Sequence, residues 1–472
     1  DFARIFFGCQ YAGLVTAPLP LPVAFGGKEA YLSTLRGMIR SAQASAVIIP
    51  NIIEGWTDEI VSGLGLVFAG SPAELMERIV PDMPLPEIKP EALSYLQFSS
   101  GSTRFPMGVC VTQQSGMANV AAIAHDGLRV HETGDRCVSW LPLYHDMGLV
   151  GFFLTPMTCQ LTVDLLPTRE FARRPHVWLD LISRNRGTIA YSPSFGYELC
   201  ARRPAAEDLD LSCWRVAGIG GDMIRPHILQ EFADRFATAG FRAEAFVASY
   251  GMAEATLAIS FVPLNSGIKT DTVDLPRLEN DGVARPPVDS DTPARTFVVC
   301  GQVLPGHQME VRGPNGRVLA DREVGTIYVR GPSLMSGYFR MEEETRKVVD
   351  RDGWLNTGDL GYMLNGQIVV TGRAKDLSII NGRNIWPQDL EWSAETHLSA
   401  LRSRDVAVFS LEKGDHEEIV ALIQCRASDP DTREGLRSEA SSLFRRLHGV
   451  DVSVVLVPPR TLPQTSSGKL AG

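Results

Sequence analysis

The stretch LQFSSGSTRFPMGV, residues 96–109, decides the fold class because it leads from a strand-like run through a polar loop toward a helix. The apolar lead ends at Phe98, and a segment with helical periodicity begins at Ser115. Backbone N–H groups around a glycine, together with nearby hydroxyls, are suited to hold phosphate oxygens. A serine- and glycine-rich surface turn is the alternative, because both residues are common in turns. The polar loop contains Ser99, Ser100, Gly101, Ser102, Thr103 and Arg104.

Strand-length apolar runs alternate with helical segments through the first half of the chain. ASAVIIP (44–50), CVSWLPL (137–143) and TIAYSPS (188–194) are strand-like. Segments 115–128 and 171–186 have the spacing of helices that cover a sheet. The alternation predicts an α/β fold with parallel-type sheets covered by helices.

The second half changes character after Phe261. A polar, turn-rich passage at about 264–294 predicts an insert, and short runs such as GTIYVRG predict a β-rich subdomain. The last hundred residues form a separate, smaller α/β pattern. We therefore expect an N-terminal domain over 1–374 and a small mobile C-terminal domain over 375–472. A long disordered loop is the other interpretation of the passage at 264–294, and the two are compatible.

Composition excludes several classes of protein. A net charge of -10 gives no basic footprint for nucleic acid. The eight cysteines include no CxxC pair, which favours reduced core residues in a cytoplasmic protein over a zinc or disulfide framework. No apolar run approaches the roughly 20 residues of a transmembrane helix. The chain opens on DFARIFF without a methionine, so we expect that it starts in mid-fold and that a segment precedes it.

The polar loop matches neither the P-loop motif GxxxxGK(S/T) nor the dinucleotide-binding motif GxGxxG. Its function must therefore be inferred together with other segments of the chain. In chain order these segments are FSSGSTRFPMGV (98–109), LPLYHDMGL (141–149), SYGMAEAT (249–256), WLNTGDLG (354–361), GRAKDLSIINGRNIWPQDLE (372–391) and LPQTSSGKL (462–470). Together they resemble the core motifs of the adenylate-forming acyl ligases. Within that superfamily they look most like fatty acyl-AMP ligases.

This resemblance implies a reaction and its participants. ATP and a fatty acid would give fatty acyl-AMP and pyrophosphate, with Mg²⁺ bridging the phosphates. The acyl group would then pass to the phosphopantetheine thiol of an acyl carrier protein. Two alternatives stay open: a fatty acyl-CoA ligase, and a degenerate fold that binds nucleotide or acyl groups without turnover. Met107 stands where most of the superfamily has lysine, as is common in fatty acyl-AMP ligases.

The resemblance also assigns residues to the nucleotide. The serine-rich loop would hold pyrophosphate, with Arg104 as its local cation. Asp359 and Arg373 would contact the ribose, and Glu254 would be the ligand of Mg²⁺. A solvated glutamate is the plain alternative for Glu254, as a core tyrosine is for Tyr250. The adenine would contact Tyr250, Gly251 and Met252, and also Gly220, Gly221 and Asp222, where the family usually shows Gly-Ala-Glu-Pro.

The remaining assignments concern the acid and the moving domain. His145 would help to position the carboxylate, with a structural histidine as the alternative. Lys469, in TSSGKL, would bridge that carboxylate and the α-phosphate. Lys375 would be the hinge. Phe195 and Tyr197 are candidate liners of the acyl pocket, although aromatic residues in such a run are more often ordinary core.

Overall fold

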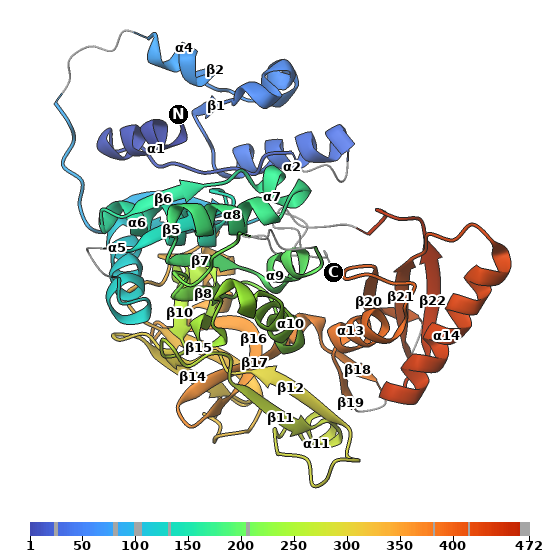
Figure 1. Cartoon of the computed structure of the whole chain (residues 1–472). Coiled ribbons are helices and arrows are strands. Elements are labelled where there is room, and N and C mark those ends of the chain that lie inside the picture. Colours follow the sequence, from blue (N-terminus) through green and yellow to red (C-terminus); the bar gives the residue numbers. More distant parts are fainter. Residues whose placement is uncertain are drawn as a thin grey trace.

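The computed structural model describes residues 1–22, 27–78, 84–98, 106–130, 134–203, 208–380, 383–413 and 416–462. A central seven-stranded sheet has the order β13-β10-β9-β8-β7-β5-β6 (Figure 1). Its strands β5 to β9 run parallel, β10 pairs antiparallel with β9, and β13 pairs antiparallel with β10. The predicted α/β class is thus confirmed. The bounds are β5 (Arg136–Ser139), β6 (Thr162–Leu165), β7 (Ile189–Ser192), β8 (Val216–Ile219), β9 (Phe246–Gly251), β10 (Ala258–Phe261) and β13 (Gln302–Val303).

Helices connect and cover these strands. In α10 the buried residues Ile228, Phe232 and Phe236 recur four apart, so one face packs on the sheet. The helix predicted over 171–186 is wrong as a single element. Pro175, which cannot continue a helix from the preceding turn, separates α7 from α8. The covering helices are α5 (Gln113–Ala121), η2 (Ala122–Gly127), η3 (Met147–Leu154), α6 (Thr155–Thr158), α7 (Thr168–Arg173), α8 (His176–Asn185), α9 (Ser194–Ala201) and α10 (Pro226–Phe236).

The two ends of the stretch 96–109 belong to a pair of strands. Strands β3 (Leu93–Phe98) and β4 (Gly108–Thr112) pair antiparallel, and the serine-rich loop joins them. Thr112 caps α5 by accepting a hydrogen bond from Ser115 N at 3.1 Å. The preceding elements are α1 (Phe2–Tyr11), α2 (Gly27–Ser41), β1 (Ala46–Ile48), η1 (Asn51–Trp56), α3 (Thr57–Val61), β2 (Phe68–Gly70) and α4 (Pro72–Met76).

A four-stranded antiparallel sheet, β14-β15-β16-β17, forms the β-rich part of the chain. The passage predicted as an insert contains β11 and α11, and β11 pairs with β12. The bounds are β11 (Thr270–Asp274), α11 (Leu275–Asp281), β12 (Ala294–Val298), β14 (Gln308–Arg312), β15 (Gly325–Arg330), α12 (Glu342–Val348), β16 (Leu355–Leu364) and β17 (Gln367–Arg373). Short turns of 3-10 helix are η4 (Ala237–Ala239), η5 (Ala243–Ala245), η6 (Ala253–Ala255) and η7 (Ala374–Asp376).

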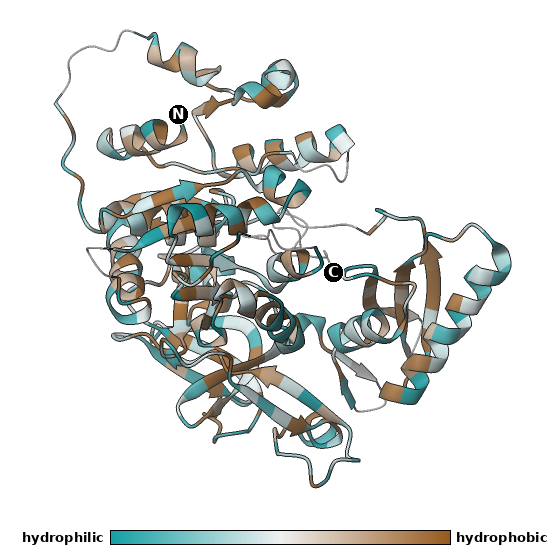
Figure 2. Cartoon of the chain, in the orientation of Figure 1, coloured by the Kyte–Doolittle hydropathy of each residue, from teal (hydrophilic) through white to brown (hydrophobic). Residues whose placement is uncertain are grey.

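The last part of the chain stands beside the rest (Figure 1) and has a hydrophobic cluster of its own. Apolar strands face the helix α14, whose outer surface is hydrophilic (Figure 2). Leu436, Ala440 and Phe444 of α14 are buried at a spacing of four. The elements are β18 (Ser378–Ile380), β19 (Arg383–Ile385), α13 (Pro387–His397), β20 (Val406–Lys413), β21 (His416–Gln424), α14 (Pro430–His448) and β22 (Val452–Val457). In the described part of the chain, none of the helices has the length and apolar character to span a bilayer.

Candidate functional site

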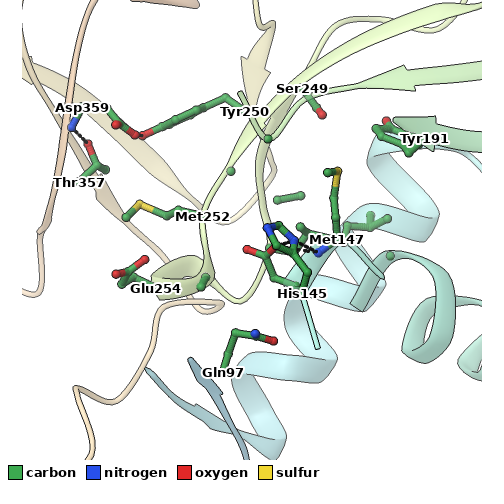
Figure 3. Close-up of a pocket in the computed structure, with 18 of the residues that line it drawn as sticks. Gln97, His145, Met147, Tyr191, Ser249, Tyr250, Met252, Glu254, Thr357 and Asp359 are labelled. Atoms are coloured by element: carbon green, nitrogen blue, oxygen red, sulfur yellow. Dashed lines mark hydrogen bonds and ion pairs between the residues drawn. The ribbon is translucent and has the colours of Figure 1, made fainter. Parts of the chain in front are cut away.

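A cavity of about 390 Å³ lies where the central sheet meets the four-stranded sheet (Figure 3). His145 follows β5, Tyr191 belongs to β7 and Gly221 follows β8, so this wall is formed at the carboxyl ends of parallel strands. Ligands of open α/β sheets bind at that edge. Asp359 of β16 and Arg373 of β17 belong to the opposite sheet.

Asp359 is the centre of the polar end. Tyr250 donates a hydrogen bond from its hydroxyl to Asp359 Oδ2 at 2.7 Å, and Arg373 Nε lies 3.5 Å from Asp359 Oδ1. The pairing of β16 with β17 places Asp359 opposite Arg373. Burial, and then the Asp359 carboxylate, raises the pKa of Tyr250 well above its usual value, so the phenol stays a donor. Gly358 has a φ of +73°, and within the described residues no non-neighbouring atom lies within 4 Å of where a side chain would start, which leaves room for a ligand.

Glu254 is buried on the same wall, in the turn η6 after β9. Its Oε1 accepts a hydrogen bond from the Tyr338 hydroxyl at 2.9 Å, and its backbone oxygen accepts one from Met335 N at 2.8 Å. Burial raises the pKa of Glu254, and the hydrogen bond from Tyr338 acts in the opposite direction. The carboxylate is therefore held in one orientation by a neutral donor.

His145 lies on the cavity wall (Figure 3) and forms a third polar feature with Asp146. His145 Nδ1 lies 2.6 Å from Asp146 Oδ1, which also accepts a hydrogen bond from Met147 N at 2.7 Å. Gln97 donates from Nε2 to Tyr144 O at 2.7 Å and so fixes the loop that carries the histidine. The buried Oε1 of Gln97 has no hydrogen-bond partner in the part of the chain that the structure describes. The sequence did not single out Gln97, although it directly precedes the last residue of β3.

The rest of the wall is apolar. It is formed mainly by the π-helices η2 and η3 and by β10. A Cβ on residue 127 would lie 2.7 Å from the Phe261 ring. Gly127 therefore allows the ring to occupy its observed position. The apolar residues are Phe98, Met107, Ile123, Leu128, Met147, Phe152, Leu257, Ala258 and Phe261.

The two residues expected to line an acyl pocket lie elsewhere. Tyr197 is fully buried in an aromatic cluster and donates to Gly218 O at 2.8 Å. Phe195 packs against Trp140, and the Arg404 guanidinium lies 3.7 Å from the centre of its ring. Neither is among the residues that line the cavity. The apolar wall of the cavity includes η3 instead, whose sequence MGLVGFFL has no polar face and could not be distinguished from ordinary core.

Most of the other residues named from the sequence line the cavity or adjoin its wall. Lys375 lines the cavity beside Arg373, and burial, followed by that arginine, lowers its pKa. Gly220 and Asp222 adjoin the wall without lining it, although Gly221 does. A Cβ on Gly221, whose φ is +82°, would lie 2.9 Å from Met147 Cε. Among the residues named from the sequence, those that line the cavity are His145, Gly221, Tyr250, Gly251, Met252, Glu254, Asp359, Arg373 and Lys375.

The serine-rich loop (Ser99, Ser100, Gly101, Ser102, Thr103 and Arg104) and Lys469 lie outside the described residues. Phe98 and Met107, close to the two ends of that loop, both line the cavity. Among the residues that are described, no cluster of three or more His, Cys, Asp or Glu side chains could hold a metal ion. Glu254 offers a hard oxygen ligand of the kind that Mg²⁺ takes when it is bound chiefly through substrate phosphates.

Comparison with known proteins gives a consistent result. The family model for AMP-binding enzymes matches residues 1–339. A putative acyl-CoA synthetase of Caulobacter vibrioides is 54% identical over 474 residues, which cover 100% of this chain and 82% of that protein. The medium-chain-fatty-acid–acyl-carrier-protein ligase JamA of Moorena producens is 32% identical, covering 100% of this chain and 82% of its own length.

A solved structure from work on fatty acyl-adenylate ligases of E. coli and L. pneumophila superimposes with a TM-score of 0.95. It is 45% identical and covers 100% of this chain and 84% of that one. The similarity to fatty acyl-AMP ligases that the six motifs indicate is thereby confirmed, and the chain belongs to the family of AMP-binding enzymes.

Proposed function

We propose that this enzyme activates a fatty acid with ATP to give fatty acyl-AMP and pyrophosphate, and then transfers the acyl group to the phosphopantetheine thiol of an acyl carrier protein. The observation that carries the proposal is the cavity, which combines a hydrogen-bonded polar end with a continuous apolar wall. Such a cavity suits a nucleotide joined to an aliphatic chain. JamA is named as a ligase of medium-chain fatty acids to carrier protein, which supports the same substrates.

The polar end supplies contacts for the nucleotide. Asp359 would accept hydrogen bonds from the ribose hydroxyls, while Tyr250 and Arg373 keep its carboxylate in place. Glu254 would face the magnesium ion that accompanies ATP. When bound, that ion would neutralise part of the phosphate charge. Adenine would lie along the wall formed by Tyr250, Gly251 and Met252.

In the first step a carboxylate oxygen attacks the α-phosphorus, and the bond to the β-phosphate oxygen breaks to release pyrophosphate. Lys469 and Arg104 would supply positive charge to the oxygens involved. In the second step the thiol sulfur attacks the acyl carbonyl, loses its proton, and AMP leaves. His145, held by Asp146 and the loop that Gln97 fixes, would orient the acid between the nucleotide and the apolar wall.

The acceptor depends on the C-terminal domain, with its boundary at 374 and 375 and its hinge at Lys375. Arg383 contacts Glu279 of the insert at 2.5 Å, and Arg295 contacts Asp389 at 2.8 Å. Glu279 and both members of the Arg295–Asp389 pair are largely shielded from solvent, while Arg383 is partly exposed. Both pairs would break if the domain rotated, so they oppose that movement. The choice of carrier protein as acceptor rests on the similarity to JamA, which is named as a ligase of fatty acids to carrier protein. The name of the Caulobacter relative favours a second candidate, a fatty acyl-CoA ligase.

A paired assay tests the proposal. The protein is incubated with ATP, Mg²⁺ and fatty acids of graded length, and pyrophosphate release and acyl-AMP are measured. Holo carrier protein or coenzyme A is then added. We expect pyrophosphate release that depends on fatty acid, followed by acylated carrier protein. Rapid formation of acyl-CoA would favour the second candidate, and no release with any fatty acid would favour the non-catalytic alternative.

A further inference from the structure

The connecting segment 331–341, between β15 and α12, pairs with the strand that follows the serine-rich loop. Cys110 N donates to Gly337 O at 2.9 Å, and Ser336 N donates to Cys110 O at 3.1 Å. Phe339 N donates to Gly108 O at 2.8 Å. The connecting segment therefore runs alongside β4 within a few residues of that loop.

The same segment also holds the turn of Glu254. Thr256 donates from its hydroxyl to Ser333 O at 2.7 Å, and Met335 N donates to Glu254 O. Thr256 has a φ of +67°, which is unfavourable for a β-branched residue and persists only where surrounding contacts enforce it. The backbone of the turn is thus fixed from the connecting segment.

Tyr338, in the same connecting segment, also fixes the Glu254 side chain. Its ring is buried in the main core, and its backbone N–H donates to Thr345 Oγ1 at 2.9 Å, so the phenol has little freedom. The hydroxyl engages Oε1 of Glu254 at 2.9 Å, which fixes the plane of the carboxylate. A phenol does this without cancelling the negative charge, whereas an arginine would compete with a cation for it.

We propose that Tyr338 is a positioning residue, which holds the Glu254 carboxylate toward the magnesium ion that ATP brings to the proposed adenylation site. The inference rests on the proposed function for its ligand, and on the contacts of the connecting segment for its geometry. The connecting segment also pairs with β4, the strand that follows the serine-rich loop. It therefore contacts both that strand and the residues that hold the Glu254 carboxylate. Figure 3 shows Glu254 on the cavity wall near Met252.

The test compares Tyr338→Phe with Tyr362→Phe. Tyr362 is a matched control, because its buried hydroxyl donates to the Asp271 carboxylate at 2.6 Å and it does not line the cavity. Binding of Mn²⁺ to the protein with α,β-methylene-ATP, without fatty acid, is measured by electron paramagnetic resonance. Tyr338→Phe is expected to weaken Mn²⁺ binding about 10-fold or more, because the carboxylate loses the donor that fixes its orientation. Tyr362→Phe is expected to change it less than twofold.

A double-mutant cycle separates positioning from general damage. Tyr338→Phe should cause no further loss in a Glu254→Gln background, because the carboxylate it orients is gone. Equal Mn²⁺ affinity in Tyr338→Phe and wild type, additive losses in the cycle, or equal weakening in the Tyr362→Phe control would each overturn the inference. The proposed function is tested by pyrophosphate release instead. If wild-type protein binds Mn²⁺ and nucleotide but releases no pyrophosphate, the proposed function is contradicted. The result on Tyr338 as a positioning residue is not affected by that outcome.

Discussion

Carboxylates in two regions of this molecule are held by different donors. At the cavity, Asp359 and Glu254 accept hydrogen bonds from the phenols of Tyr250 and Tyr338. Where the C-terminal segment meets the rest of the chain, the carboxylates face guanidinium groups at 2.5–3.0 Å. Those pairs are Arg383 with Glu279, Arg295 with Asp389, and Arg225 with Glu395.

The difference reflects what each region has to do. A phenol orients a carboxylate and leaves its charge for a ligand, so the cavity stays ready for ribose hydroxyls or a cation. Arg373, at 3.5 Å from Asp359, is a more distant partner. A guanidinium cancels the charge and links two parts of the chain. Loss of a carboxylate at the cavity should therefore reduce catalysis. Loss of a carboxylate at the interface should lower stability or change the position of the C-terminal domain.

Asp359→Ala gives the largest expected effect. The variant loses the acceptor for two ribose hydroxyls, at about 1.5–3 kcal/mol for each hydrogen bond to a charged group. We expect kcat/KM for ATP to fall by about 10²- to 10⁴-fold, measured as pyrophosphate release over an ATP titration. Tyr250→Phe keeps the ring and removes only the supporting donor, so its loss should be smaller. An unchanged KM for ATP in Asp359→Ala would show that this carboxylate does not bind the nucleotide.

Arg225→Ala tests the interface. Arg225 contacts Glu395 at 3.0 Å and stacks on Trp392, and the Glu395 side chain is only 5% exposed. Breaking a buried ion pair costs roughly 3–5 kcal/mol, and residual solvent contact of Arg225 should reduce this to about 1–3 kcal/mol. We expect a lower Tm in thermal unfolding, with the KM for ATP within about twofold of wild type. Arg173→Ala is the control, because Arg173 is 71% exposed and its contact with Glu170 should contribute little.

The polar end of the cavity could be predicted from sequence, while its supports and its apolar wall could not. Asp359 follows Thr357 and Gly358 within β16, and Glu254 lies in the short turn η6 after β9, so the local sequence indicates where both lie. Gln97 and Tyr338 act through residues far away in the chain, at separations of 47 and 84 positions. No local pattern marks such contacts. The apolar wall was missed for another reason, because an aliphatic helix next to a ligand has the same composition as one in the core.

Glu279→Gln is expected to relax the restraint on the C-terminal domain. Arg383 bonds both Glu279 and the backbone oxygen of His448, so the substitution removes the charged half of the contact and keeps the shape. We expect acyl transfer to coenzyme A to increase several-fold while pyrophosphate release in the first step changes little. The measurement is acyl-CoA formed from preformed acyl-AMP. Glu434→Gln, on the exposed face of α14, serves as the control. Equal transfer rates in wild type and Glu279→Gln would mean that this pair does not restrain the domain.

The smallest expected effect concerns Asp389. Burial raises its pKa to about 6 although Arg295 opposes the shift, so the folded protein binds a proton here that the unfolded chain releases near pH 4. Between about pH 4 and 6 the folded state therefore holds more protons, and its stability falls as the pH rises through this window. Asp389→Asn should remove that slope, seen as a smaller change in Tm from pH 4.5 to 6.5 than in wild type. The same slope in both proteins would place the titration on another group. A steeper fall in the variant would show instead that the ionised aspartate stabilises the contact with Arg295 at neutral pH.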